Sequence, residues 1–339
     1  MAKVLKLLLL LVFTTLWSFK IYAQDAVFSQ FYASPLHLNP AMAGISYGPR
    51  VNLIYRNQWP SIDKGYVTYA ASYDQHIDKI RGGVGLAFHT DRIAGGIVQN
   101  FAVQAMYSYQ LALSRKFGVK LALSGGLGSK RLDFNRLTFQ DQINPIYGFT
   151  DEFGTPNATG EFPLQQATVT YADFGGGILA FTPKFYFGTG IKHFTQPKAS
   201  FTGSDSRLPL RLALHGGYVV DVTPRKKKDD IYVSPNILLV QQSNFSQINI
   251  GTHFNYNFIS AGAYYRNTFK NSDAIIAMLG FKIEYVRIAY SFDVPLNGLG
   301  INSGGAHEVT FTFNWGGDNN SLSPNGRNFK LDCPSMLRF

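Results

Sequence analysis

The sequence predicts an all-β fold: a transmembrane antiparallel up-and-down β-barrel of about 14 strands with an N-terminal periplasmic or plug arm. The first observation is composition. Charged residues make up 15% of the 339 residues and aromatic residues also reach 15%, whereas an average soluble domain is about 25% charged. So few charges cannot cover a soluble surface of this size, and a lipid-facing wall accounts for the aromatic excess. The other observations are a period-two pattern and the order of short and long connections.

The first 23 residues read as a secretory signal peptide. Lys3 and Lys6 precede an apolar run from Leu7 to Trp17, and Ala23 provides a small residue for cleavage. The run is too short for a membrane helix, and no later apolar stretch reaches the roughly 18 residues that a helical span needs. No cysteine stands directly after the signal region, so we do not expect a lipid anchor.

Residues 24–49 form the predicted arm, which contains FSQFYASPLHLNPAMAG at 28–44. Pro35 and Pro40 each favour extended geometry in the residue before them, and prolines are excluded from central strands. The segment therefore fits neither a regular helix nor a strand, and Asn39-Pro40-Ala41 predicts a capped turn. Its apolar side chains must pack inside the barrel near the periplasmic end or against a partner below it, unless this is an ordinary N-terminal arm.

Period-two alternation runs through residues 50–315, the predicted outer-membrane barrel. In 66–74, 286–293 and 308–315, apolar side chains alternate with small or polar ones, which is typical of strands. The apolar faces carry repeated Tyr, Phe and Trp, as the lipid-facing girdles of barrels do, so the small and polar face is the inner one. The predicted strands are 50–59, 66–76, 82–91, 97–113, 117–129, 168–181, 185–194, 209–222, 231–241, 247–256, 259–267, 273–283, 285–294 and 306–315.

The connections between these strands alternate in length. Barrels of this kind have short periplasmic turns and longer outer loops. If the first strand runs outward, nearly all long connections fall on the outer side. The longest, 130–167, is rich in aromatic residues and either folds over the mouth or docks a partner. Residues 316–339 are interrupted by glycine and proline and form a predicted periplasmic tail.

The motif at 28–44, followed by Tyr55-Arg56-Asn57-Gln58-Trp59, closely resembles the opening of the PorP/SprF family of type IX secretion system outer-membrane proteins. The resemblance is strongest over residues 25–75 and continues as strand pattern and in the Cys333-Pro334 tail. It implies a location in the outer membrane, in contact with its lipid. The implied partners are the secretion machinery and a secreted surface protein, either an adhesin or a peptidase.

The predicted partner- or plug-binding site combines the arm with the end of the first strand. If Asn52 points into the lumen, Arg56 points inward and can brace a plug, while Asn57, Gln58 and Trp59 belong to the outer rim. The site residues are Phe28, Ser29, Gln30, Phe31, Tyr32, Pro35, Leu36, Asn39, Pro40, Gly44, Arg56, Asn57, Gln58 and Trp59.

No catalytic, cofactor or metal site is predicted. Residues 44–48 fit G-x-S-x-G without the strand and helix that a nucleophile elbow needs. His307-Glu308 has no second histidine at the required spacing, and the seven histidines and the single cysteine, Cys333, show no ligand pattern. Polar residues expected in the lumen are more simply explained as hydrogen-bonded cross-links; they are Asn52, Arg56, Asp74, Arg211, Arg287, Asp293 and Glu308.

Three functions fit a barrel of this kind. The net charge of +10 comes from scattered basic residues in an exported chain, so no nucleic-acid partner is expected. The candidates are a barrel that docks, anchors or assists secretion of a surface protein, a diffusion channel or porin, and a barrel hydrolase. The absence of a Ser-His pattern weakens the hydrolase, and the arm favours the docking barrel over the porin. No small-molecule substrate is predicted.

Overall fold

The computed structural model describes residues 25–46, 48–114, 116–161, 167–222, 231–269, 271–298 and 300–315. The predicted signal peptide at 1–23 and the predicted tail at 316–339, including Cys333, lie outside the described residues. The same holds for residues 223–230, a connection between two predicted strands that contains the basic run Arg225-Lys226-Lys227-Lys228.

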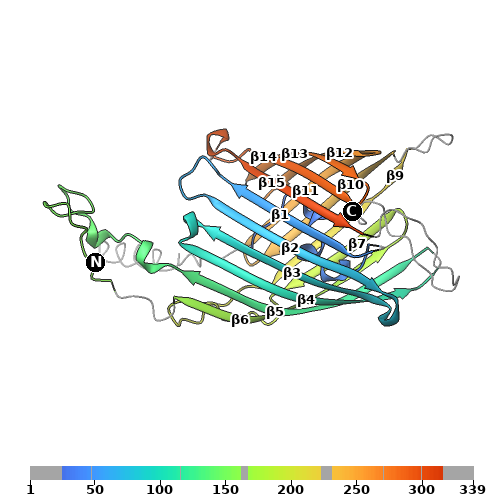
Figure 1. The fold of residues 1–339 in the computed structure, drawn as a ribbon, viewed down its shortest axis with the longest axis horizontal. Helices are drawn as coiled ribbons and strands as arrows, with labels where there is room; N and C mark the ends of the chain where they lie inside the picture. Colours follow the sequence, from blue (N-terminus) through green and yellow to red (C-terminus); the bar gives the residue numbers. More distant parts are fainter. Residues whose placement is uncertain are drawn as a thin grey trace, which may run out of the picture.

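The described chain forms a closed antiparallel barrel of 14 strands with one short additional strand, β9 (Figure 1). Consecutive strands pair along the whole ring, and β1 closes it by pairing with β15, where Arg56 is in register with Glu308. The predicted antiparallel up-and-down barrel of about 14 strands is confirmed. The strands are β1 (Arg50–Gln58), β2 (Tyr66–Ile77), β3 (Gly82–Ile93), β4 (Val98–Ala112), β5 (Gly118–Leu132), β6 (Thr168–Phe181), β7 (Phe185–Lys192), β8 (Arg211–Tyr218), β9 (Val220–Asp221), β10 (Ile231–Gln242), β11 (Phe245–Tyr256), β12 (Ile259–Asn267), β13 (Ser272–Ile283), β14 (Val286–Pro295) and β15 (Ala306–Asn314).

Two details differ from the sequence-based expectation. The strand expected at 209–222 is interrupted at Val219, whose amide donates to the carbonyl oxygen of Lys184 (2.7 Å) in the neighbouring turn. The connection expected at 242–246 is only a two-residue turn, because Phe245 still pairs with Gln242 and Ser243 adopts a positive φ of 52°.

The predicted alternation of inner and outer faces is present in the strands. In β1, Asn52, Ile54 and Arg56 are buried, whereas Leu53 and Tyr55 are exposed. The polar residues expected in the lumen, from Asn52 to Glu308, are all buried. The wall therefore presents an apolar outer surface and a polar inner one, as a membrane barrel requires.

The barrel has two different ends. We call the end at which loops 133–167, 193–210 and 296–305 emerge the long-loop end, and the opposite end, with connections such as 182–184 and 257–258, the short-turn end (Figure 1). The loops carry short 3₁₀ turns, which are η3 (Asp78–Ile80), η4 (Ala94–Gly96), η5 (Phe134–Arg136), η6 (Gln140–Gln142) and η7 (Ile301–Ser303).

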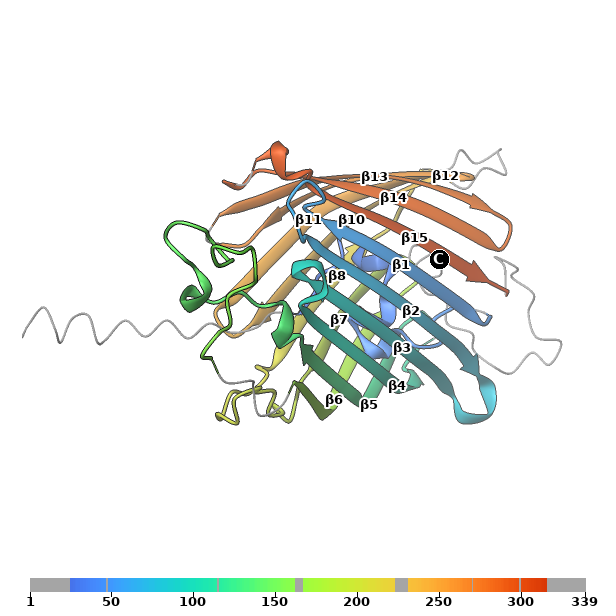
Figure 2. The ribbon, with the colours of Figure 1, turned by 60° about the vertical axis from the view of Figure 1, so that its left-hand side comes forward.

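The arm lies inside the ring of strands (Figure 2). It consists of three short helical turns, η1 (Phe31–Ala33), α2 (Pro35–Leu38) and η2 (Pro40–Met42). Nearly all of its side chains from Phe28 to Ser46 are buried, and several join barrel residues in one apolar core. Within the described ranges, no helix is long and apolar enough to cross a membrane.

Candidate functional site: the arm in the lumen

The arm runs through the lumen from the long-loop end to the short-turn end. At its start, the amide of Asp25 donates to Oε1 of Gln242 (3.0 Å), the last residue of β10, and its carboxylate lies 2.8 Å from Nε2 of His193, just after β7. At its other end, the carbonyl oxygen of Ala43 accepts from Lys120 Nζ (2.6 Å) in β5. We expected the arm either inside the barrel near its periplasmic end or against a partner below it. It lies inside the barrel and extends as far as the long-loop end, where Asp25 contacts His193.

Glu308 fixes the position of the arm through two successive backbone amides. Its Oε2 accepts from the amide of Ser29 and its Oε1 from the amide of Gln30, both at 2.8 Å. The Gln30 side chain adds bonds to Ser291 Oγ (3.2 Å) and from Thr310 Oγ1 (2.9 Å). Hydrogen bonds to a buried carboxylate are stronger than neutral ones, so this pair defines the register of the arm on the wall.

Arg56 points inward, as predicted, and connects the arm to three strands. Its Nη1 donates to Ser29 Oγ (2.6 Å) and to Glu308 (3.0 Å), and its Nη2 donates to Asp293 (2.9 Å). Arg266 reaches the same Asp293 oxygen (2.9 Å) and Ser29 Oγ (3.2 Å). Buried charges are costly unless they are paired and hydrogen-bonded. Here Ser29 supplies part of that pairing, so the arm is a member of the charge cluster.

The predicted aromatic residues of the arm form its apolar core. Phe31 and Tyr32 are both buried, and each packs against Tyr264, Phe31 edge-on with ring centroids 5.7 Å apart. The Tyr32 hydroxyl contacts the sulfur of Met278. Phe28 packs edge-on against His37 of the arm at 5.5 Å. These side chains hold the arm in the lumen and are not accessible to a partner.

The predicted capped turn is present at Asn39. Its Oδ1 accepts from the amide of Ala41 (2.9 Å), with Pro40 at the first position of η2. Its Nδ2 donates to the carbonyl oxygen of Ile178 in the wall (3.0 Å). Pro35 and Leu36 are buried beside it, and Leu36 packs over β3.

Wall glycines allow the arm to approach the barrel backbone. A Cβ at Gly177 would lie 2.0 Å from Asn39 Oδ1, and one at Gly190 would lie 2.5 Å from the carbonyl oxygen of Leu38. At the short-turn end, Gly44 has a φ of +62°, and its own Cβ would lie 2.6 Å from Gly83 Cα. Gly44 was predicted. The wall glycines were missed. A glycine in a strand indicates that another segment packs close to the backbone, but the sequence does not say which segment.

The predicted rim residues are not brought to the arm. Asn57, Gln58 and Trp59 are half-buried at the end of β1. The Trp59 amide donates to the carbonyl oxygen of Gly305 (2.7 Å), so this segment contacts the loop before β15 instead.

A second charge cluster, missed from the sequence, holds the start of the arm. His193 contacts Asp25 through Nε2 and Asp173 through Nδ1 (3.0 Å). Burial disfavours the charged imidazole, but the two carboxylates raise the pKa of His193 to about 9. The sequence contains little signal for this cluster, since Asp25 is simply the second residue after the predicted cleavage site.

The long loop at 133–161 is folded and extends beyond the barrel wall (Figure 1). Asn157 closes it by donating from Nδ2 to the carbonyl oxygen of Gln142 (2.8 Å). Ile146 is 81% exposed and Phe153 is 84% exposed. Large apolar side chains exposed on an ordered loop make it a candidate interaction surface. Among the described residues, no group of His, Cys, Asp and Glu side chains could hold a metal ion.

Comparisons with known proteins identify one family and several solved structures to which the chain is similar. The family model described as "Type IX secretion system membrane protein PorP/SprF" matches residues 20–313. Among curated proteins, none matches the chain. Similar solved structures are Omp33 of Acinetobacter baumannii (10% identity, 80% of this chain and 100% of that one, TM-score 0.43) and the toluene transporter TodX of P. putida (13%, 82% and 92%, 0.44). A porin variant from Rhodopseudomonas blastica has 7% identity, coverage of 79% and 98%, and a TM-score of 0.32.

Proposed function

Because the chain belongs to the PorP/SprF family of type IX secretion system membrane proteins and forms an outer-membrane β-barrel, we propose that it is a plugged, non-enzymatic barrel that docks, anchors or assists secretion of a cell-surface protein. The client is an adhesin or a peptidase. The observation that carries this proposal is the arm, which extends through the lumen from the long-loop end to the short-turn end.

The filled lumen argues against the diffusion channel. A barrel of about fourteen strands is wide enough to conduct unless its interior is filled. Here the filling is bound by hydrogen bonds at both ends and by Phe31 and Tyr32 between them. An arm that simply leaned against the wall would not need a charge cluster with Arg56 and Glu308. The porin remains the alternative function.

The folded loop at the long-loop end is the proposed docking surface. Ile146 and Phe153 are the most exposed apolar side chains of this loop, and the loop itself extends beyond the end of the barrel (Figure 1). Loss of an apolar anchor at an interface costs about 2 kcal/mol or more, which is roughly thirtyfold in affinity.

The test compares two matched double variants in cells. Ile146→Ser with Phe153→Ser changes the long loop, and Leu113→Ser with Ile283→Ser changes side chains at the short-turn end that are 63% and 72% exposed. The client is first identified as a surface protein that disappears when the barrel is deleted. Its surface level is then measured against the barrel level in outer-membrane fractions.

We expect the long-loop variant to lose most client display and the short-turn variant to keep it, at equal barrel levels. Phe31→Ala with Tyr32→Ala should also lower display, because a loosened arm disturbs the mouth that it lines. Unchanged display in both the loop and arm variants would refute the docking function. A large, steady conductance of the purified wild-type barrel would favour the porin.

A further inference from the structure

We propose that the long-loop end of the lumen contains a carboxylate-binding site, formed by Lys192, Arg211 and His193, which Asp25 occupies and which an acidic peptide segment of a partner protein takes over when the arm start leaves. The identity of this occupant rests on the proposed docking function. The site itself rests on the arrangement of charges around Asp25.

Two of these cations face each other across neighbouring strands. Lys192 ends β7 and Arg211 begins β8, and the two are register partners. Like charges placed directly opposite each other are destabilising. Arg211 is 7% exposed, and its buried Nε has no hydrogen-bond partner among the described residues. Neither side chain has a salt bridge in the part of the chain that the structure describes. A buried guanidinium without a salt bridge is costly, and binding an anion would lower that cost.

Asp25 supplies a carboxylate whose negative charge interacts with both cations. Its Oδ2 lies 2.8 Å from His193, and its amide is held by Gln242, which is the register partner of Arg211 on β10. Burial alone would raise its pKa, yet the charges of His193, Arg211 and Lys192 hold the pKa of Asp25 well below its ordinary value. Asp25 therefore acts as a built-in ligand, presented by an extended peptide segment.

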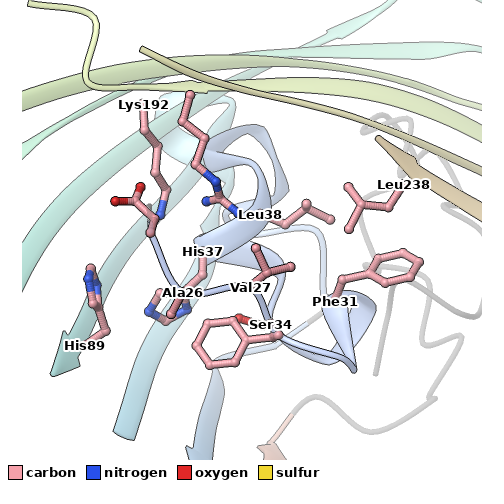
Figure 3. Close-up of a pocket in the computed structure, with 12 residues that line it drawn as sticks. Ala26, Val27, Phe31, Ser34, His37, Leu38, His89, Lys192 and Leu238 are labelled. Carbon is pink, nitrogen blue, oxygen red and sulfur yellow. The ribbon is translucent and has the colours of Figure 1, made fainter. Parts of the chain in front are cut away.

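The geometry leaves room for another peptide. Lys192 reaches from the wall toward the arm beside His37 and His89 (Figure 3). Next to it, a cavity of about 290 Å³ extends from Asp25 to Phe101, Tyr171 and Phe201. This volume is far above the roughly 10–15 Å³ that one water needs. Residues 25–27 are only half-buried, so the arm start can leave without moving the buried aromatic core behind it.

The experiment uses the purified full-length barrel in detergent and a fluorescein-labelled hexapeptide with one central aspartate among small apolar residues. The same peptide with asparagine is the control probe. Binding is measured by anisotropy for the wild type, for Asp25→Asn, and for Asp25→Asn combined with Lys192→Gln and Arg211→Gln. Gel mobility without heating verifies that each barrel is folded.

We expect Asp25→Asn to bind the aspartate peptide at least about tenfold more tightly than the wild type does, because the tethered competitor is gone. The asparagine peptide should bind no variant. The triple variant should bind the aspartate peptide more weakly than Asp25→Asn does. Equal binding of both peptides, or the same affinity in the wild type and Asp25→Asn, would overturn the site. Displacement of the peptide by inorganic phosphate but not by acetate would overturn its assignment to carboxylates. The binding assay contains no secretion component. If the peptide binds as expected but the display test fails, the carboxylate-binding site stands and only its assignment to a secreted partner protein is refuted.

Discussion

Two buried serines in the arm provide a direct test of what holds it in the lumen. Ser29 and Ser34 are both 1% exposed. Ser29 Oγ donates to Asp293 (2.6 Å) and accepts from Arg56 (2.6 Å) and Arg266 (3.2 Å). Ser34 Oγ has no hydrogen-bond partner within the described chain. The same substitution, Ser→Ala, therefore removes three bonds to charged groups in one case and none in the other.

We expect Ser29→Ala to weaken arm docking by about 1.5–3 kcal/mol, the value of a hydrogen bond to a charged group. Because Arg56, Arg266 and Asp293 keep their mutual ion pairs, the three bonds are not additive. This range corresponds to roughly 10- to 150-fold faster opening of the arm. Ser34→Ala should leave the opening unchanged or slow it slightly, because it removes a buried hydroxyl that has no partner.

Hydrogen–deuterium exchange of peptides covering residues 30–40 measures this opening. The reporter amides are those of Ala33, Leu38 and Asn39, which bond to carbonyl oxygens within the arm. Peptides from β4 serve as an internal reference for the barrel. Equal acceleration in both variants, or none in Ser29→Ala, would refute the conclusion that the charge cluster anchors the arm.

Two further outcomes follow from the contacts of the arm. Gly190→Ala should increase the conductance of the purified barrel, because its Cβ would lie 2.5 Å from the Leu38 carbonyl oxygen and overpacking costs about 1–3 kcal/mol. The control is Gly125→Ala, whose Cβ meets only the Phe174 ring at 3.4 Å. Equal conductance of the two variants would contradict the prediction. A nitroxide on Ala26→Cys in a Cys333→Ser background should be immobile at neutral pH and become mobile as the pH rises through about 9. His193 faces Asp25, Asp173, Lys192 and Arg211, and its pKa is raised from 6.5 to about 9; its charged form therefore stabilises the folded arm fully below pH 6.5, and this contribution disappears above 9. Mobility that does not change with pH would contradict this role of His193.

Local pattern was enough to predict the wall, but the arm depends on contacts between distant residues. Period two placed Arg56, Asp293 and Glu308 on the inner face, because each strand carries its own alternation. Their convergence on Ser29 could not be predicted, because it requires the ring to close between β1 and β15. The direction of the arm was missed for a similar reason. It is set by Asp25 and His193, which are 168 positions apart in the sequence.

The path of the arm also restricts how the protein can assemble. The arm starts at the long-loop end, crosses the lumen and leaves at the short-turn end, where β1 begins, and β1 is one side of the final seam. An arm that is already in place when the sheet closes avoids threading its helical turns and buried aromatic rings through a finished ring. We therefore expect the open sheet to curl around the arm before its first and last strands meet. Ser29 and Gln30, bonded to Glu308 on one side of that seam and to Arg56 on the other, are placed to guide the meeting.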